Sequence, residues 1–214
     1  MTKIRQRLND VASRDYAVFH KKIAATNKAI LGVKLPVLRK MSREFSLEEI
    51  EAEDMSVYEN FMLYCLAVMR LKYEDLIPRL DAMLCEADSW VYVDCSVAGS
   101  KALKDNAEKL PYDLEFLLRG GTFAKRFYIV AALWYFPFSD KAMDDIAALS
   151  FGDYYVDMAA AWYISVLFTL DFGKATEYFA RFPALVKKLT VRKCLDSFRL
   201  SKEQKAEIRA LRVD

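Results

Sequence analysis

The feature that most constrains the fold of this chain is a repeat with a period of 32 residues. Tyr58, Trp90, Thr122 and Tyr154 follow one another at this interval, and each begins a strongly apolar stretch. The intervening segments are more polar and long enough to hold a second helix in each unit. A period of this length with two helices per unit is typical of α-solenoids. The repeat therefore predicts an all-α fold.

Composition and capping residues agree with helices joined by short loops. The 214 residues include only 6 Gly and 5 Pro, which interrupt helices. Ser56 (with Glu59 three residues later), Ser89, Ser139 and Ser201 are expected to cap helices. Helices are expected near residues 3–12, 15–27, 36–44, 56–72, 74–86, 89–103, 111–119, 122–136, 139–149, 153–170, 173–182, 190–198 and 201–211. With no long linker, we expect a single domain over residues 1–214, an α-α superhelix of HEAT-like or ARM-type repeats.

The cysteines and the single histidine argue against a metal centre or a disulfide framework. The 4 cysteines, Cys65, Cys85, Cys95 and Cys194, form no CxxC pair. Free thiols indicate a reduced, cytoplasmic protein. His20, the only histidine, is expected to be structural or solvated. The polar N-terminus does not resemble a signal peptide, and no apolar run reaches about 18 residues, so no membrane association is expected.

Charge is distributed unevenly along the chain. Residues 1–43 carry a net charge of +9 and residues 174–214 a net charge of +6, whereas residues 44–118 carry −11 and residues 119–173 carry −2. Two basic ends that flank an acidic middle could grip a nucleic acid. They could equally be ordinary solvated helix faces.

Four polar or aromatic residues take related positions in the repeat. Trp90 begins its unit, Asp94 and Arg126 stand four residues after the start of theirs, and Trp162 stands eight residues after its start. Positions four and eight residues apart lie on one face of a helix. If that face is the concave one, an aspartate, an arginine and two indoles converge on one groove.

Each of these residues also has a purely structural interpretation. Trp90 and Trp162 could be core aromatics, because Trp is usually largely buried. Asp94 and Arg126 could form a bridge between stacked helices. Trp134, in the apolar run AALWYF, is interpreted as core.

The ordered segments KAILGVKLPVLRKM, SWVYVDCS, FAKRFYIVAAL, YYVDMAAAWYISVLF and TVRKCLDSFRLS together resemble one protein family over nearly the whole chain. The chain is similar to the DNA alkylation repair enzymes of the AlkD-like type, which are HEAT-like-repeat DNA glycosylases. SWVYVDCS resembles the family's Trp-x-x-x-Asp motif. One departure is Asp157, which stands where relatives often carry Lys or another polar DNA-facing residue.

The resemblance implies roles for the residues that match. Asp94 would lie beside the deoxyribose of the lesion, Trp90 and Trp162 would contact the same sugar and its backbone, and the phosphates would be bound by Arg126, Lys125, Arg192 and Lys193. It implies a concave DNA-facing groove, a monomer, and double-stranded DNA with alkylated bases as partner. The implied activity in base excision repair is the removal of N3- or N7-alkylated purines without base flipping, unlike most glycosylases.

The chemistry suits these residue types. An N-alkylated purine is cationic and leaves readily, and cleavage of its glycosidic bond builds oxocarbenium character on the sugar. A nearby carboxylate stabilises that charge, and indole faces favour a cation. No cofactor or metal is expected. Two alternatives remain open, namely a non-catalytic binder of bent or branched DNA and a protein-interaction scaffold.

Overall fold

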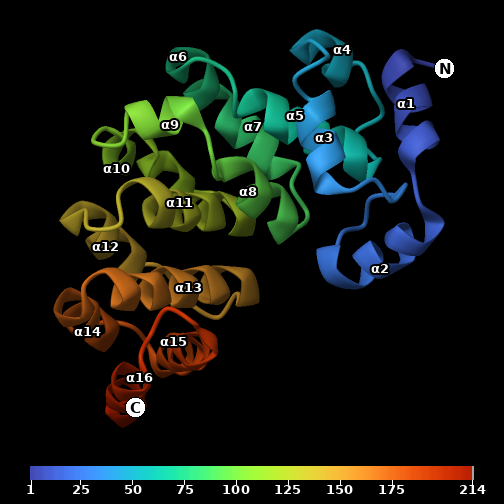
Figure 1. The fold of residues 1–214 in the computed structure, drawn as a ribbon. Coiled ribbons are helices and arrows are strands. Elements are labelled where there is room, and N and C mark those ends of the chain that lie inside the picture. Colours follow the sequence, from blue (N-terminus) through green and yellow to red (C-terminus); the bar gives the residue numbers. More distant parts are fainter. Residues whose placement is uncertain (214) are drawn as a thin grey trace. The chain divides into compact units, whose positions relative to one another are not determined.

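The computed structural model describes residues 1–213, and all regular secondary structure in this range is helical (Figure 1). The α-helices are α1 (Lys3–Val11), α2 (Arg14–Ala24), α3 (Leu35–Met41), α4 (Leu47–Glu51), α5 (Tyr58–Val68), α6 (Tyr73–Leu76), α7 (Leu80–Cys85), α8 (Trp90–Val97), α9 (Lys101–Asp105), α10 (Leu110–Asp113), α11 (Thr122–Tyr135), α12 (Asp140–Ala147), α13 (Tyr154–Leu170), α14 (Phe172–Ala180), α15 (Ala184–Asp196) and α16 (Lys202–Ala210). Two 3-10 helices, η1 (Ile77–Arg79) and η2 (Glu115–Arg119), complete the set. The predicted all-α class is confirmed.

The predicted repeat is present in the positions where helices start. α5 begins at Tyr58, α8 at Trp90, α11 at Thr122 and α13 at Tyr154, the four positions that share the 32-residue spacing. The residue before each of these helices has extended backbone geometry, so each helix has a sharp beginning. A shorter helix follows within each repeat: α7, α9, α12 and α14. The first two repeats also contain short helical elements, α6 with η1 and α10 with η2, so the periodicity lies in the helix starts.

The chain forms two compact units, Met1–Asn106 and Ala107–Asp214. In the first unit, α5 packs against α3, α4 and α8. In the second unit, α13 packs against α11, α14 and α15, and α15 also packs against α16 (Figure 1). A single domain and a superhelix with a concave groove stay predictions.

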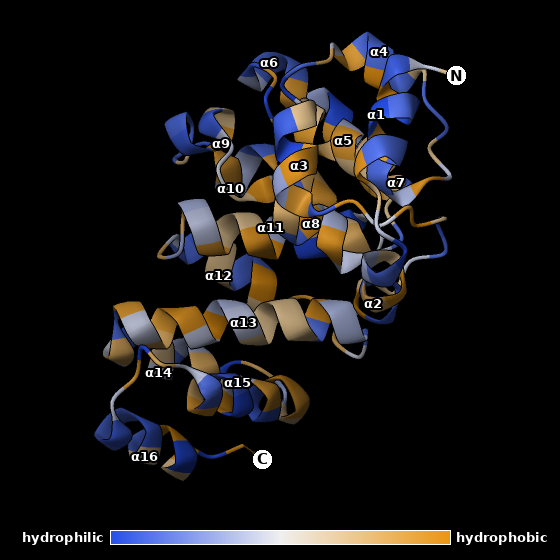
Figure 2. Cartoon of the chain, turned by 45° about the vertical axis from the view of Figure 1, so that its right-hand side comes forward, coloured by the Kyte–Doolittle hydropathy of each residue, from blue (hydrophilic) through white to orange (hydrophobic). Residues whose placement is uncertain are grey.

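The long helices α11 and α13 form the core of the second unit. Both bury most of their side chains, including Tyr128 and Tyr163. The Tyr128 hydroxyl donates to Asp145 over 2.7 Å and the Tyr163 hydroxyl donates to the Pro137 carbonyl over 2.8 Å. Buried phenols are thereby satisfied. The terminal helices α1 and α16 are instead largely hydrophilic (Figure 2).

Three of the four predicted N-caps are confirmed. The side chains of Ser89, Ser139 and Ser201 each accept a hydrogen bond from a backbone N–H in the first turn of the following helix. The cap predicted at Ser56 is wrong, because α5 begins at Tyr58 with Val57 as its cap residue. Its expected partner, Glu59, is used elsewhere.

Several predicted helix boundaries are also wrong. The helix expected over 89–103 is two helices, since α8 ends at Val97 and the chain turns at Gly99, whose φ of +88° favours glycine. The helix expected at 190–198 already begins at Ala184, directly after Pro183. α4 was not predicted, although Ser46 begins it with a capping box.

The prediction that Trp134 belongs to the core is wrong. Its side chain is 50 % exposed, whereas the preceding Leu133 is buried. α11 ends at Tyr135, so Trp134 lies in the last turn, on a side of the helix that solvent reaches. An apolar run alone does not show where burial stops.

Candidate functional site

The predicted site residues of α8 lie on the accessible side of that helix. Trp90, Asp94 and Ala98 are all partly exposed, and they are spaced four residues apart. The intervening segment 91–93 is buried, as are Ser96 and Val97. Solvent therefore reaches one face of α8. This face contains the residue that starts the repeat and the residues four and eight positions later.

The same positions are accessible along α13. Tyr154 is exposed, and Met158 and Trp162 are partly exposed, in a helix whose remaining side chains are mostly buried. Trp162 thus lies on the stripe that the spacing predicts. This stripe and that of α8 belong to different units, so their convergence on one groove stays a prediction.

The corresponding stripe of α11 is buried after its first residue, Thr122, which is partly exposed. Arg126 is only 6 % exposed and Val130 is fully buried. Nη1 of Arg126 donates a 2.8 Å hydrogen bond to the carbonyl oxygen of Tyr155, in the first turn of α13. The guanidinium therefore ties α11 to α13 within the second unit, a structural contact that the spacing did not reveal.

The start of α8 is held against the end of α2. Nε1 of Trp90 donates to the carbonyl of Ile23 over 3.2 Å, and the Ser89 hydroxyl donates to the carbonyl of Ala24. Both acceptors are in the last turn of α2, whose carbonyls lack partners inside the helix. Trp90 is consequently oriented by a fixed hydrogen bond while part of its ring stays accessible.

A buried carboxylate that sequence reasoning missed organises the loop between α2 and α3. Glu59, in the first turn of α5, is fully buried. Its Oε2 accepts from the N–H of Leu31 over 2.9 Å, and its Oε1 accepts from Gly32 and Val33 over 2.7 and 3.1 Å. Gly32 has φ +94°, and a Cβ there would lie 2.1 Å from the Ser13 carbonyl oxygen. The LGV segment thus requires both its glycine and this carboxylate.

Asp157 has a comparable local role in the second unit. It is 2 % exposed, and its Oδ1 accepts a 3.0 Å hydrogen bond from the N–H of Gly152. The carboxylate is directed at the loop before α13 and is absent from the stripe that contains Met158 and Trp162. A Lys-to-Asp departure at this position therefore places no acidic side chain on that stripe.

The predicted basic contacts all lie in the second unit. Lys125 on α11 and Lys193 on α15 are partly exposed, and Arg192 on α15 is exposed. α11 and α15 both pack against α13, the helix of Trp162. Three packed helices of the second unit thus contain five of the predicted residues, namely Lys125, Arg126, Trp162, Arg192 and Lys193. The other two, Trp90 and Asp94, lie on one helix of the first unit.

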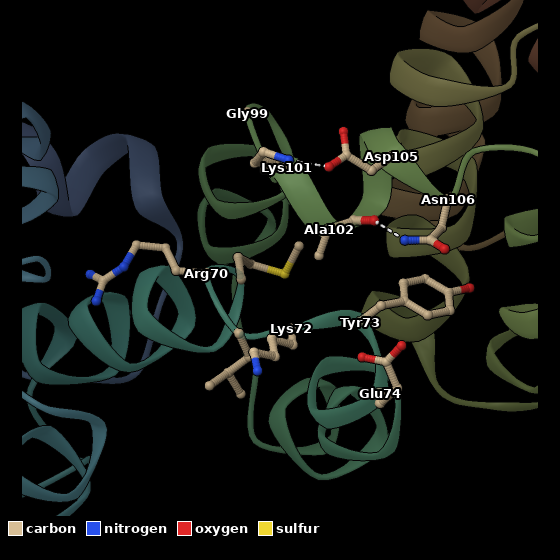
Figure 3. Close-up of a pocket in the computed structure, with 11 residues that line it drawn as sticks. Arg70, Lys72, Tyr73, Glu74, Gly99, Lys101, Ala102, Asp105 and Asn106 are labelled. Carbon is tan, nitrogen blue, oxygen red and sulfur yellow. Dashed lines mark hydrogen bonds and ion pairs between the residues drawn. The ribbon is translucent and has the colours of Figure 1, made fainter.

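A separate concavity lies in the first unit (Figure 3). It has a volume of about 440 Å³ and lies between the segment 69–74 and α9. An ion pair joins Lys101 to Asp105 on its rim, and Nδ2 of Asn106 donates to the carbonyl of Ala102 over 3.0 Å. None of the predicted site residues lines it.

The remaining chemistry-bearing groups are dispersed. All four cysteines are free thiols, as predicted, and burial raises the pKa of Cys95 to about 11. Within residues 1–213, no three His, Cys, Asp or Glu side chains are grouped closely enough to hold a metal ion. In the same range, no helix has both the length and the apolar character needed to cross a bilayer.

Comparison of the chain with protein-family models, with curated proteins and with solved structures finds no match. The similarity to AlkD-like enzymes therefore stays a prediction from the residues.

Proposed function

We propose that this protein is a monofunctional DNA glycosylase that removes positively charged N3- or N7-alkylated purines, such as 3-methyladenine and 7-methylguanine, from duplex DNA without base flipping. The observation that carries the proposal is the pairing of Trp90 and Asp94, one turn apart on the accessible stripe of α8. Glu59 and Asp157, by contrast, are buried carboxylates that bind backbone N–H groups. Asp94 is partly exposed, as a group that approaches a substrate must be.

In the proposed reaction the lesion supplies most of the driving force. The alkylated purine carries a positive charge and departs as a neutral base when its bond to C1′ breaks. The carboxylate of Asp94 stabilises the oxocarbenium character that develops on the deoxyribose, and the indoles of Trp90 and Trp162 provide electron-rich faces beside the sugar. Water then adds to C1′ and releases a proton to solvent. The hydrogen bond from Trp90 to Ile23 supports this role because it holds the ring in one orientation.

The backbone phosphates in this proposal are bound mainly by the accessible cations of the second unit. Lys125, Arg192 and Lys193 are the exposed or partly exposed members of the predicted set. Arg126 contributes charge, but its hydrogen bond to Tyr155 and its burial assign it the additional task of positioning α13.

The proposal is tested by base release from methylated duplex DNA. Wild-type protein should release 7-methylguanine, and Asp94→Asn should lower the rate at least about hundredfold, because the charge that stabilises the transition state is removed. DNA binding should be nearly unchanged. Asp75→Asn is a matched control, since Asp75 is an exposed carboxylate of the same unit on α6. Wild-type excision by the Asp94→Asn protein would reject the mechanism.

A second candidate is a non-catalytic binder of bent or branched DNA. It is favoured by the structural contacts of Trp90 and Arg126, which account for both residues without any excision chemistry. Tight binding to a four-way junction, without release of any alkylated base by the wild-type protein, would select this candidate.

A further inference from the structure

Three arginines of the first unit surround a small cavity at the carboxyl ends of three helices. Arg39 is in the last turn of α3, Arg43 follows α3, and Arg70 follows α5. All three line a cavity of about 90 Å³, together with residues at the end of α8. No residue of the proposed glycosylase site lines it.

Two of the arginines are anchored to the backbone of neighbouring helices. Nη2 of Arg39 donates to the carbonyl of Cys95 over 3.3 Å. Nη1 of Arg70 donates to the carbonyl and, over 3.3 Å, to the hydroxyl of Ser42. Figure 3 shows the Arg70 side chain directed away from the Lys101–Asp105 ion pair. These bonds use one nitrogen of each guanidinium, which has five N–H donors in all.

Arg43 makes no side-chain hydrogen bond or ion pair within the described residues. The adjacent carboxylate, Glu44, is paired with Arg7 instead. Over residues 1–213, no ion pair joins Arg39 or Arg70 to a carboxylate either. The cluster is therefore three guanidinium groups without an acidic partner.

The helix ends offset only part of this charge. Each helix carboxyl end has a partial charge of roughly −0.5, so three ends supply roughly half the charge of three arginines. Capping explains Arg39 and Arg70, which bond to carbonyls at helix ends, but it does not explain Arg43. Burial, and then repulsion from Arg43, lower the pKa of Arg70. An anion in the cavity would remove the repulsion.

We propose that the cavity bordered by Arg39, Arg43 and Arg70 binds a phosphate group. Guanidinium N–H groups match the oxygens of phosphate and bind them in pairs. The cavity has the volume of about three waters, which suits one tetrahedral oxyanion and excludes a nucleoside. The group is either a phosphodiester of a nucleic acid or a free phosphate. Phosphate binding here is independent of base excision, and either can fail without the other.

Arg43→Ala is the informative variant, because Arg43 has no structural contact to lose. Lys40→Ala is its matched control, since Lys40 lies three residues away, is exposed, carries the same charge and does not line the cavity. Circular dichroism and thermal unfolding establish that both variants fold. Two probes are used with the full chain. Binding of a fluorescein-labelled DNA duplex is measured by fluorescence anisotropy at several salt concentrations. Binding of inorganic phosphate is measured as thermal stabilisation relative to chloride at equal ionic strength.

We expect Arg43→Ala to weaken binding of at least one probe about tenfold, and Lys40→Ala to weaken it less than about twofold. A loss for the duplex, with a salt slope lowered by about 0.9, identifies a phosphodiester. A loss for inorganic phosphate alone identifies a free phosphate. Equal losses in the two variants, or wild-type binding of both probes by Arg43→Ala, would overturn the proposal.

Discussion

Asp94 and Arg126 occupy the same position in consecutive repeats, four residues after the helix start, yet their surroundings are opposite. Asp94 is partly exposed on a stripe of α8 that solvent reaches. Arg126 is 6 % exposed and bonds to the backbone of α13. The spacing of a repeat therefore determines which face of a helix a residue takes, and the packing around each helix determines what that face can do.

The comparison separates charged residues that are buried from those that solvent reaches. Glu59 lies at the start of α5, is fully buried and accepts three backbone hydrogen bonds. It belongs with Arg126 in the first group, and Asp94 belongs in the second. Stability measurements should therefore rank the three residues by burial.

The largest effect on stability is expected for Glu59→Ala. The substitution leaves the N–H groups of Leu31, Gly32 and Val33 without their acceptor, and Gly32 and Val33 are buried. We expect the free energy of unfolding to fall by about 3–5 kcal/mol. Urea unfolding followed by circular dichroism measures it.

The matched variant for this measurement is Asp94→Ala, which removes the same charge from an accessible position. We expect a clearly smaller change, of about 1 kcal/mol, because the carboxylate is partly exposed. If the two variants were equally stable, burial would not distinguish the groups and the comparison would fail.

An intermediate effect is expected for Arg126→Ala. The partly buried carbonyl of Tyr155 loses its hydrogen bond from Arg126 and a cavity remains beside α13, so the free energy of unfolding should fall by about 2–3 kcal/mol. Arg126→Lys should recover part of the loss, because an ammonium can donate one hydrogen bond there. A stable Arg126→Ala protein with weakened DNA binding would instead assign Arg126 to the ligand.

The sequence predicts local and periodic features well, because the residues that cause them are close together. The four repeat helices begin at the residues that share the 32-residue spacing, and three of four serine caps are correct, since each cap involves residues within one turn. Contacts between distant residues were missed. Glu59 was expected to cap its own helix but binds a loop 26 to 28 residues away, and Arg126 binds Tyr155.

The arginine cluster was missed for the same reason. Arg39 and Arg43 are visible in the sequence as part of a basic helix, but Arg70 is separated from them by an acidic segment. Only the packing of α5 against α3 brings the three together. The absence of acidic partners is likewise a property of the fold, because Glu44 is next to Arg43 in sequence and bonds to Arg7.

The smallest effect is expected from His20, which extends the comparison to a group that titrates. Its ring stacks on Tyr16 and meets Tyr58 edge-on, and its buried Nε2 has no hydrogen-bond partner. Burial lowers its pKa below 6.5, and the nearby Glu59 opposes this only in part. The unfolded chain therefore binds a proton more readily than the folded one, so stability falls as the pH decreases from about 7 through 6.5.

The substitution His20→Phe keeps the ring contacts and removes the titration. Because the chain has one histidine, the difference in Tm between wild type and variant isolates it from the carboxylates that also protonate. The ring is partly exposed, so the difference should grow by no more than about 2 °C between pH 7.5 and 5.5. Parallel pH profiles for the two proteins would show that His20 is equally easy to protonate in the folded and unfolded chains.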